Sequence, residues 1–108
     1  MSKILVWIKE PFKKAKHVWI SPRLENLQKT VGGYIEAIWV SNDAVILCNE
    51  EALLTDTKYN VTVGGIQLFG PIILVGQQGE EFASCKLTAD DMMILFPDWM
   101  KEGKNESE

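Results

Sequence analysis

Groups that could do chemistry are few in this chain of 108 residues, and their spacing argues against a catalytic centre. The single histidine, His17, falls on a short predicted strand, where a solvated or half-buried side chain is commoner than a catalytic base. Neighbouring side chains on a strand point to opposite faces, so adjacent acidic pairs such as Glu50-Glu51 do not converge on a metal ion. We therefore expect a protein that is not an enzyme and that uses no cofactor.

The two cysteines, Cys48 and Cys85, are far apart in the sequence and lack the Cys-x-x-Cys spacing of metal and redox sites. Cys48 lies inside the apolar run AVILCN of residues 44–49, where a cysteine usually behaves as a small buried hydrophobe. We expect two free thiols and a place in the core for Cys48.

Charge is distributed unevenly along the chain. The net charge is −4, but residues 1–31 carry seven Lys and Arg against two Glu, whereas residues 32–108 carry four Lys against thirteen Asp and Glu. A nucleic-acid-binding domain usually has a basic excess that neutralises phosphates, so we expect no direct binding of DNA or RNA. An acidic exterior fits a small-ligand binder or an inhibitor of a basic protein.

The length and composition predict a single small domain. Hydrophobic residues make up 46% of the chain and charged residues 24%, the balance of a globular protein. We place the domain at residues 1–100 and expect a disordered polar tail over residues 101–108. The chain has no apolar run of about 18 to 20 residues and no secretory signal, so we expect a cytoplasmic protein without membrane contact.

Apolar periodicity predicts the elements of the first half of the chain. Leu24, Leu27 and Val31 form one stripe on a helix that Ser21 caps and that Gly32-Gly33 ends. The turn formers Ser41-Asn42-Asp43 separate two apolar runs, which predicts an antiparallel hairpin. The expected elements are strands at residues 3–8 and 17–20, a helix at residues 22–31, and hairpin strands at residues 34–40 and 44–49.

The second half is less regular. We expect a surface loop over residues 50–60 with Leu53 and Leu54 tucked under it, and an apolar run over residues 66–75 that Gly70-Pro71 interrupts as a bulge or a kink. A turn is expected at residues 76–79, since this glycine-containing segment does not open a helix as a dinucleotide-binding turn does. A short strand is expected around Phe82, Ser84 and Lys86.

A second short helix follows. Thr88 and Asp91 approximate a capping box, and Pro97 ends the helix. Its expected apolar face consists of Met92, Met93, Leu95 and Phe96. The whole pattern predicts an α+β fold, with a twisted, mostly antiparallel sheet of four to six strands and one or two short helices on one face.

Three motifs occur in a fixed order: Val31-Gly32-Gly33-Tyr34-Ile35-Glu36, then Cys48-Asn49-Glu50-Glu51, then Gly70-Pro71-Ile72-Ile73-Leu74-Val75-Gly76. With the elements between them, they make residues 3–96 similar to domain-of-unknown-function family 3846, small proteins of phages and mobile elements of Gram-positive bacteria. The resemblance implies a viral or mobile-element setting. It brings no catalytic residues.

Two functions fit these observations. The first is a counter-defence protein, a homo-oligomer with a pocket between subunits, that sequesters a nucleotide-derived immune signal of the cyclic-nucleotide or ADP-ribose type. The second is an acidic inhibitor that covers the basic site of a host defence protein or nucleic-acid-binding protein. Its surface would run from Glu50 to Asp56 and from Asp90 to the tail.

For the first function we expect aromatic stacking, phosphate contacts and hydrogen bonds to sugar or base edges. Each candidate also has a structural interpretation: core packing for the tryptophans, an exposed sheet face for Glu36, a turn for Asn49. The candidate ligand-binding residues are Trp7 or Trp39 for stacking, Lys9 and Lys14 for phosphate, and Tyr34, Glu36 and Asn49 for sugar or base edges.

Overall fold

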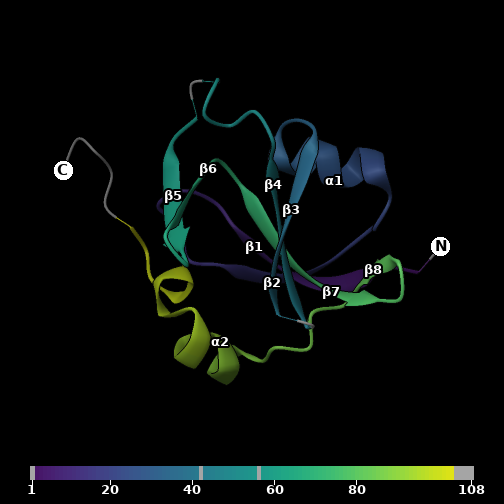
Figure 1. Ribbon diagram of the computed structural model, residues 1–108. Coiled ribbons are helices and arrows are strands. Elements are labelled where there is room, and N and C mark those ends of the chain that lie inside the picture. The colour runs from purple at the N-terminus through teal and green to yellow at the C-terminus, as the bar shows by residue number, and fades with distance from the viewer. Residues whose placement is uncertain (1, 42, 56, 104–108) are drawn as a thin grey trace.

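The computed structural model describes residues 2–41, 43–55 and 57–103, and these form an α+β fold around one antiparallel sheet. Its strand order is β2-β1-β7-β4-β3, and β8 pairs with the end of β7 (Figure 1). The fold class predicted from the sequence is confirmed. The strands are β1 (Ile4–Lys9), β2 (Lys16–Ile20), β3 (Ile35–Ser41), β4 (Ala44–Asn49), β7 (Ile72–Gln78) and β8 (Glu81–Ala83).

Other elements cover both faces of the sheet. This follows from the sequence, because the central strands carry apolar side chains on both faces and these side chains must be kept from water. All six residues of β4 and the first five of β7 are buried, the pattern of strands enclosed between two layers. On one side, called the α1 face, Leu27 and Val31 of α1 (Leu24–Val31) pack on Val45, Leu47 and their neighbours. On the other side, called the α2 face, Met92 of α2 (Ala89–Leu95) packs on the sheet. The expectation that the helices share one face is therefore wrong.

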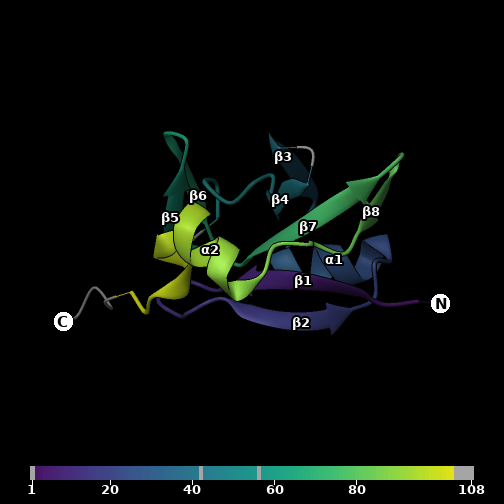
Figure 2. The same cartoon turned by 90° about the horizontal axis from the view of Figure 1, so that it is seen from below.

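A separate two-stranded sheet completes the α2 face. β5 (Tyr59–Val63) pairs with β6 (Ile66–Phe69), and Val61 and Leu68 join the same core cluster as Met92. Figures 1 and 2 both show this hairpin beside the C-terminal helical segment, which ends in the short helix η1 (Pro97–Met100). Neither α1 nor α2, nor any other helix in the described residues, is long and apolar enough to span a membrane.

The ends of the helices follow the predicted chemistry in two places. Gly32 ends α1 in the left-handed conformation, with φ of 87°, and its N–H donates to Gln28 O at 2.8 Å. Thr88 caps α2: Asp91 N donates to Thr88 Oγ1 at 3.2 Å and Thr88 N donates to Asp91 Oδ2 at 2.9 Å. The start of α1 differs, because Arg23 is its N-terminal cap and makes no side-chain capping bond.

Residues 50–60 differ from the predicted surface loop in two ways. Leu53 and Leu54 are 76% and 84% exposed rather than tucked under it, and the segment ends in strand β5 rather than in a loop. The prediction at Gly70-Pro71 is confirmed as a kink, since Gly70 has φ of 73° and the chain passes there from β6 to β7 in the other sheet. Of the predicted turn at Ser41-Asn42-Asp43, Asn42 lies outside the described residues.

Gly76 lies within β7, and the turn predicted to begin there comes three residues later. The left-handed residue of that turn is Gly79, with φ of 62°, between β7 and β8. A Cβ atom on Gly76 would lie 2.4 Å from Ser84 O, a backbone atom. Glycine is therefore required at residue 76 by the close approach of Ser84, the residue that follows β8.

Candidate functional site

The structure does not bring the seven predicted ligand-binding residues together in one place. Trp7 and Lys9 of β1 are only 4% and 2% exposed. Trp7 Nε1 donates to Leu87 O at 3.0 Å, and its ring stacks on His17 with centroids 4.1 Å apart. This matches the core interpretation of Trp7, while Lys14 is exposed in the connection between β1 and β2.

The other four predicted residues lie on β3 or next to it. Tyr34 and Trp39 are exposed, and Trp39 Nε1 donates to the Gln77 side chain. Glu36 lies opposite Cys48 in the β3–β4 pair. Asn49 is buried, and its Oδ1 accepts from Glu51 N at 2.9 Å, which is the geometry of a turn former. Ligand binding by these seven residues stays a prediction.

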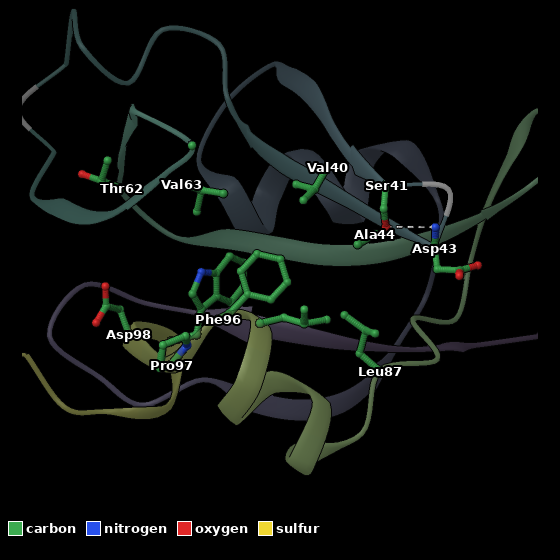
Figure 3. Close-up of a pocket in the computed structure, with 13 residues that line it drawn as sticks. Val40, Ser41, Asp43, Ala44, Thr62, Val63, Leu87, Phe96, Pro97 and Asp98 are labelled. Carbon is green, nitrogen blue, oxygen red and sulfur yellow. Dashed lines mark hydrogen bonds between the residues drawn. The ribbon is translucent and has the colours of Figure 1, made fainter.

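A cleft that the sequence did not indicate lies on the α2 face, and we call it the α2 cleft. Its volume is about 520 Å³, within the usual range for ligand sites of about 300–1,000 Å³. Figure 3 shows Val40 and Val63 on one wall and Phe96 and Leu87 on the other. The lining residues are Val40, Ser41, Asp43, Ala44, Thr62, Val63, Gly64, Leu87, Leu95, Phe96, Pro97, Asp98 and Trp99.

Three segments far apart in the sequence build the α2 cleft. The β3–β4 turn and the β5–β6 turn supply one side, and the stretch from Leu87 through α2 into η1 supplies the other. Pro97 ends α2 and starts η1, which turns Trp99 inward against Phe96 with ring centroids 5.4 Å apart. Most of the lining is apolar, so the cleft suits an aliphatic or aromatic group.

Trp99 carries an unsatisfied polar atom. Its side chain is 1% exposed, and Nε1 has no hydrogen-bond partner in the described part of the chain. A buried donor without an acceptor lowers stability by about 1–3 kcal/mol, and a buried indole N–H usually finds one. The lining of the α2 cleft therefore contains a hydrogen-bond donor that nothing in the described fold uses.

The charge in the α2 cleft has one sign. Asp43 and Asp98 line it at opposite ends, as Figure 3 shows, and no Lys, Arg or His is among its lining residues in the described chain. The negative potential of two carboxylates repels anions and attracts cations. The cleft thus favours an apolar group that is attached to a positive charge.

Exposed apolar side chains continue from the α2 cleft over α2. Met93, Ile94 and Leu95 are successive in sequence and are 54%, 77% and 58% exposed, and Leu95 also lines the cleft. The predicted apolar face of α2 is wrong for Met93 and Leu95, because this seven-residue helix turns only Met92 fully into the core. A run of exposed apolar residues on a folded domain commonly marks an interaction surface.

The thiols fit a structural role. Cys48 and Cys85 are both free and buried. Burial, with a smaller contribution from the Glu36 carboxylate, raises the pKa of Cys48 from 9.0 to about 11, and burial also raises the pKa of Cys85. At neutral pH both are therefore thiols rather than the nucleophilic thiolates.

The raised pKa of Cys48 predicts a loss of stability at high pH. The folded state holds the thiol proton above pH 9 while the unfolded chain releases it, so the free energy of unfolding falls from pH 9 towards pH 11. Urea unfolding at about pH 8 and about pH 10 measures this effect. We expect the free energy of unfolding to fall less between these two pH values for Cys48→Ala than for the wild type. Equal falls in the two proteins would contradict this.

A protein-family model described as domain of unknown function (DUF3846) matches residues 3–98. No curated protein and no solved structure matches the chain. Within residues 2–41, 43–55 and 57–103, no group of three or more His, Cys, Asp or Glu side chains is placed to hold a metal ion.

Proposed function

Because the chain belongs to DUF3846, a family whose description names no activity, we propose its function from the α2 cleft. The protein binds, without catalysing a reaction, a segment of a partner protein that carries a large apolar side chain beside a lysine or arginine. The observation that carries this proposal is the lining of the cleft, which is mostly apolar and has a carboxylate at each end.

Each part of such a segment has a counterpart in the α2 cleft. An apolar anchor of about 100–200 Å² would be removed from water between Val63 and Phe96, at roughly 25 cal/mol per Å². A lysine or arginine beside the anchor would pair with Asp43 or Asp98 at the rim.

A partner of this character is a basic protein. Proteins that bind DNA or RNA carry clustered lysine and arginine for phosphate contacts, so their binding surfaces have the sign that the α2 cleft attracts. Inhibition of such a protein, in the viral or mobile-element setting that the resemblance implies, is the counter-defence role that we propose for this binding.

Sequestration of a nucleotide-derived signal has less support. Phosphate groups are bound by cations and backbone amides, and the described lining of the α2 cleft holds two carboxylates and no basic side chain. Trp7, the first candidate for stacking, is buried and donates its N–H to Leu87 O. Sequestration stays an untested prediction.

Selection from a random peptide library on the immobilised protein tests the proposal. We expect the enriched peptides to combine an aliphatic or aromatic residue with Lys or Arg, and to lose about tenfold or more in affinity for Leu95→Glu. The matched control is Leu24→Glu: Leu24 is 59% exposed and lies on helix α1, against 58% for Leu95 on α2. The control variant is expected to bind as the wild type does.

Two outcomes of the selection would contradict the proposal. The first is enrichment of acidic peptides, or of peptides without a basic residue. The second is equal affinity of the selected peptides for Leu95→Glu and Leu24→Glu, which would place their binding site away from the α2 cleft.

A further inference from the structure

A second, smaller cavity has the buried amine of Lys9 in its lining, and we call it the Lys9 cavity. Its volume is about 290 Å³, and Tyr59, Asn60 and Lys101 also line it. The lysine is 2% exposed, which is rare for a charged side chain unless it is paired. The cavity is separate from the α2 cleft, although Asp98 lines both.

Lys9 uses two of its three N–H donors. Nζ donates to Glu10 O at 2.8 Å and to Asn60 Oδ1 at 3.0 Å, both neutral acceptors. The Asn60 amide is fixed in this orientation, because its Nδ2 donates to Lys9 O and to Gly70 O, each at 2.8 Å. This network ties β1 to β5, and within the described residues it leaves one ammonium hydrogen without an acceptor.

Among the described residues, no carboxylate forms an ion pair with Lys9. The ion pairs of Lys13 and Lys16 with Glu10 and of Arg23 with Glu25 do not involve Lys9. A buried cation without a counter-ion is unfavourable unless an anion is supplied from outside. Burial accordingly lowers the pKa of Lys9.

We propose that the Lys9 cavity binds a carboxylate group of a ligand, which accepts the third hydrogen bond of Lys9 Nζ. A carboxylate supplies both the missing acceptor and the missing negative charge. Asp98 and Glu102 also line the cavity, as does a second lysine, Lys101. A phosphate dianion would meet more repulsion from these carboxylates than a monoanion does, which favours the carboxylate.

NMR of the full chain with ¹⁵N-labelled lysine tests this proposal, with acetate and inorganic phosphate as the probes. We expect acetate to shift the Lys9 Nζ signal saturably, with a Kd in the millimolar range (about 1–10 mM), and to raise the pKa of Lys9 because a negative charge favours the ammonium. Phosphate at the same concentrations is expected to bind about tenfold more weakly.

Two variants locate the site through the backbone amide signals of Asn60 and Gly103. Lys101→Met is expected to retain the response to acetate, and Lys9→Met to lose it. If Lys9→Met does not fold, the Nζ signal of the wild type still decides. An unmoved Nζ signal, an equal acetate response in a folded Lys9→Met, or tighter binding of phosphate than of acetate would each overturn the proposal. Acetate carries no apolar tail and no positive charge, so it does not test the α2 cleft. A negative result with acetate would therefore overturn the Lys9 proposal without contradicting the proposed function.

Discussion

Replacing Trp99 with alanine is expected to lower the free energy of unfolding by about 3–5 kcal/mol, the loss typical of a buried tryptophan. Trp99 is 1% exposed and packs against Phe96 in the core cluster of the α2 face. Its carbonyl accepts from Ala15 N at 2.8 Å, which links η1 to the connection between β1 and β2. Urea unfolding of the wild type and the variant measures the loss.

Two further variants separate burial from hydrogen bonding at Trp99. Trp99→Phe keeps an aromatic ring and removes the N–H that has no acceptor in the described chain, so its loss is expected to be less than half that of Trp99→Ala. Trp19→Ala is the control, because Trp19 is 61% exposed on the edge strand β2; we expect a loss below about 1 kcal/mol. A loss for Trp19→Ala as large as for Trp99→Ala would contradict the description of the core.

Reversing both charges of the α2 cleft is expected to abolish the binding of basic, apolar peptides. In Asp43→Lys/Asp98→Lys both ends of the cleft become positive, and like charges across an interface lower affinity by several kcal/mol, about 100-fold or more. Both aspartates are exposed, so the fold should tolerate the change. Isothermal titration of a library-selected peptide, at low and at high salt, measures the effect.

The control for charge reversal is Glu80→Lys/Glu81→Lys at the exposed β7–β8 turn, which changes the net charge of the chain by the same amount. We expect less than about a threefold loss for it, because neither glutamate lines the α2 cleft and exposed charges are screened by salt. Equal losses in the two double variants would mean that the peptides respond to overall charge, and that the carboxylates of the α2 cleft have no special role.

The parts of the fold predicted correctly are those with uninterrupted patterns. The apolar run of β4 and the turn formers before it define the β3–β4 hairpin, and the glycine at residue 32 defines the end of α1. Strand β5 was missed because the Thr, Asp and Asn residues up to Asn60 indicated a loop, although Tyr59, Val61 and Val63 alternate with polar residues as in a strand. The role of Asn60 depends on Lys9, 51 residues earlier, and no local pattern contains such a pair.

The α2 cleft was beyond prediction from sequence for a related reason. Its walls come from turns near residues 40–44 and 62–64 and from residues 87–99, and only the packing of the β5–β6 hairpin beside η1 brings them together. The exposed residues of α2 were misassigned because a short helix shows too few turns to distinguish its buried side from its outer side. Lys9 was predicted only as a phosphate contact, and its burial against Asn60 follows from the tertiary structure.

The most direct test of the α2 cleft compares two probes of equal chain length and opposite charge, hexylammonium and hexanoate, by NMR titration of the ¹⁵N-labelled protein. Hexylammonium is expected to shift the backbone amides of Val40, Val63 and Leu95 saturably, and hexanoate to bind there at least about tenfold more weakly, because Asp43 and Asp98 attract the cation and repel the anion. Equal or tighter binding of hexanoate, or no response of these amides to hexylammonium, would contradict the account.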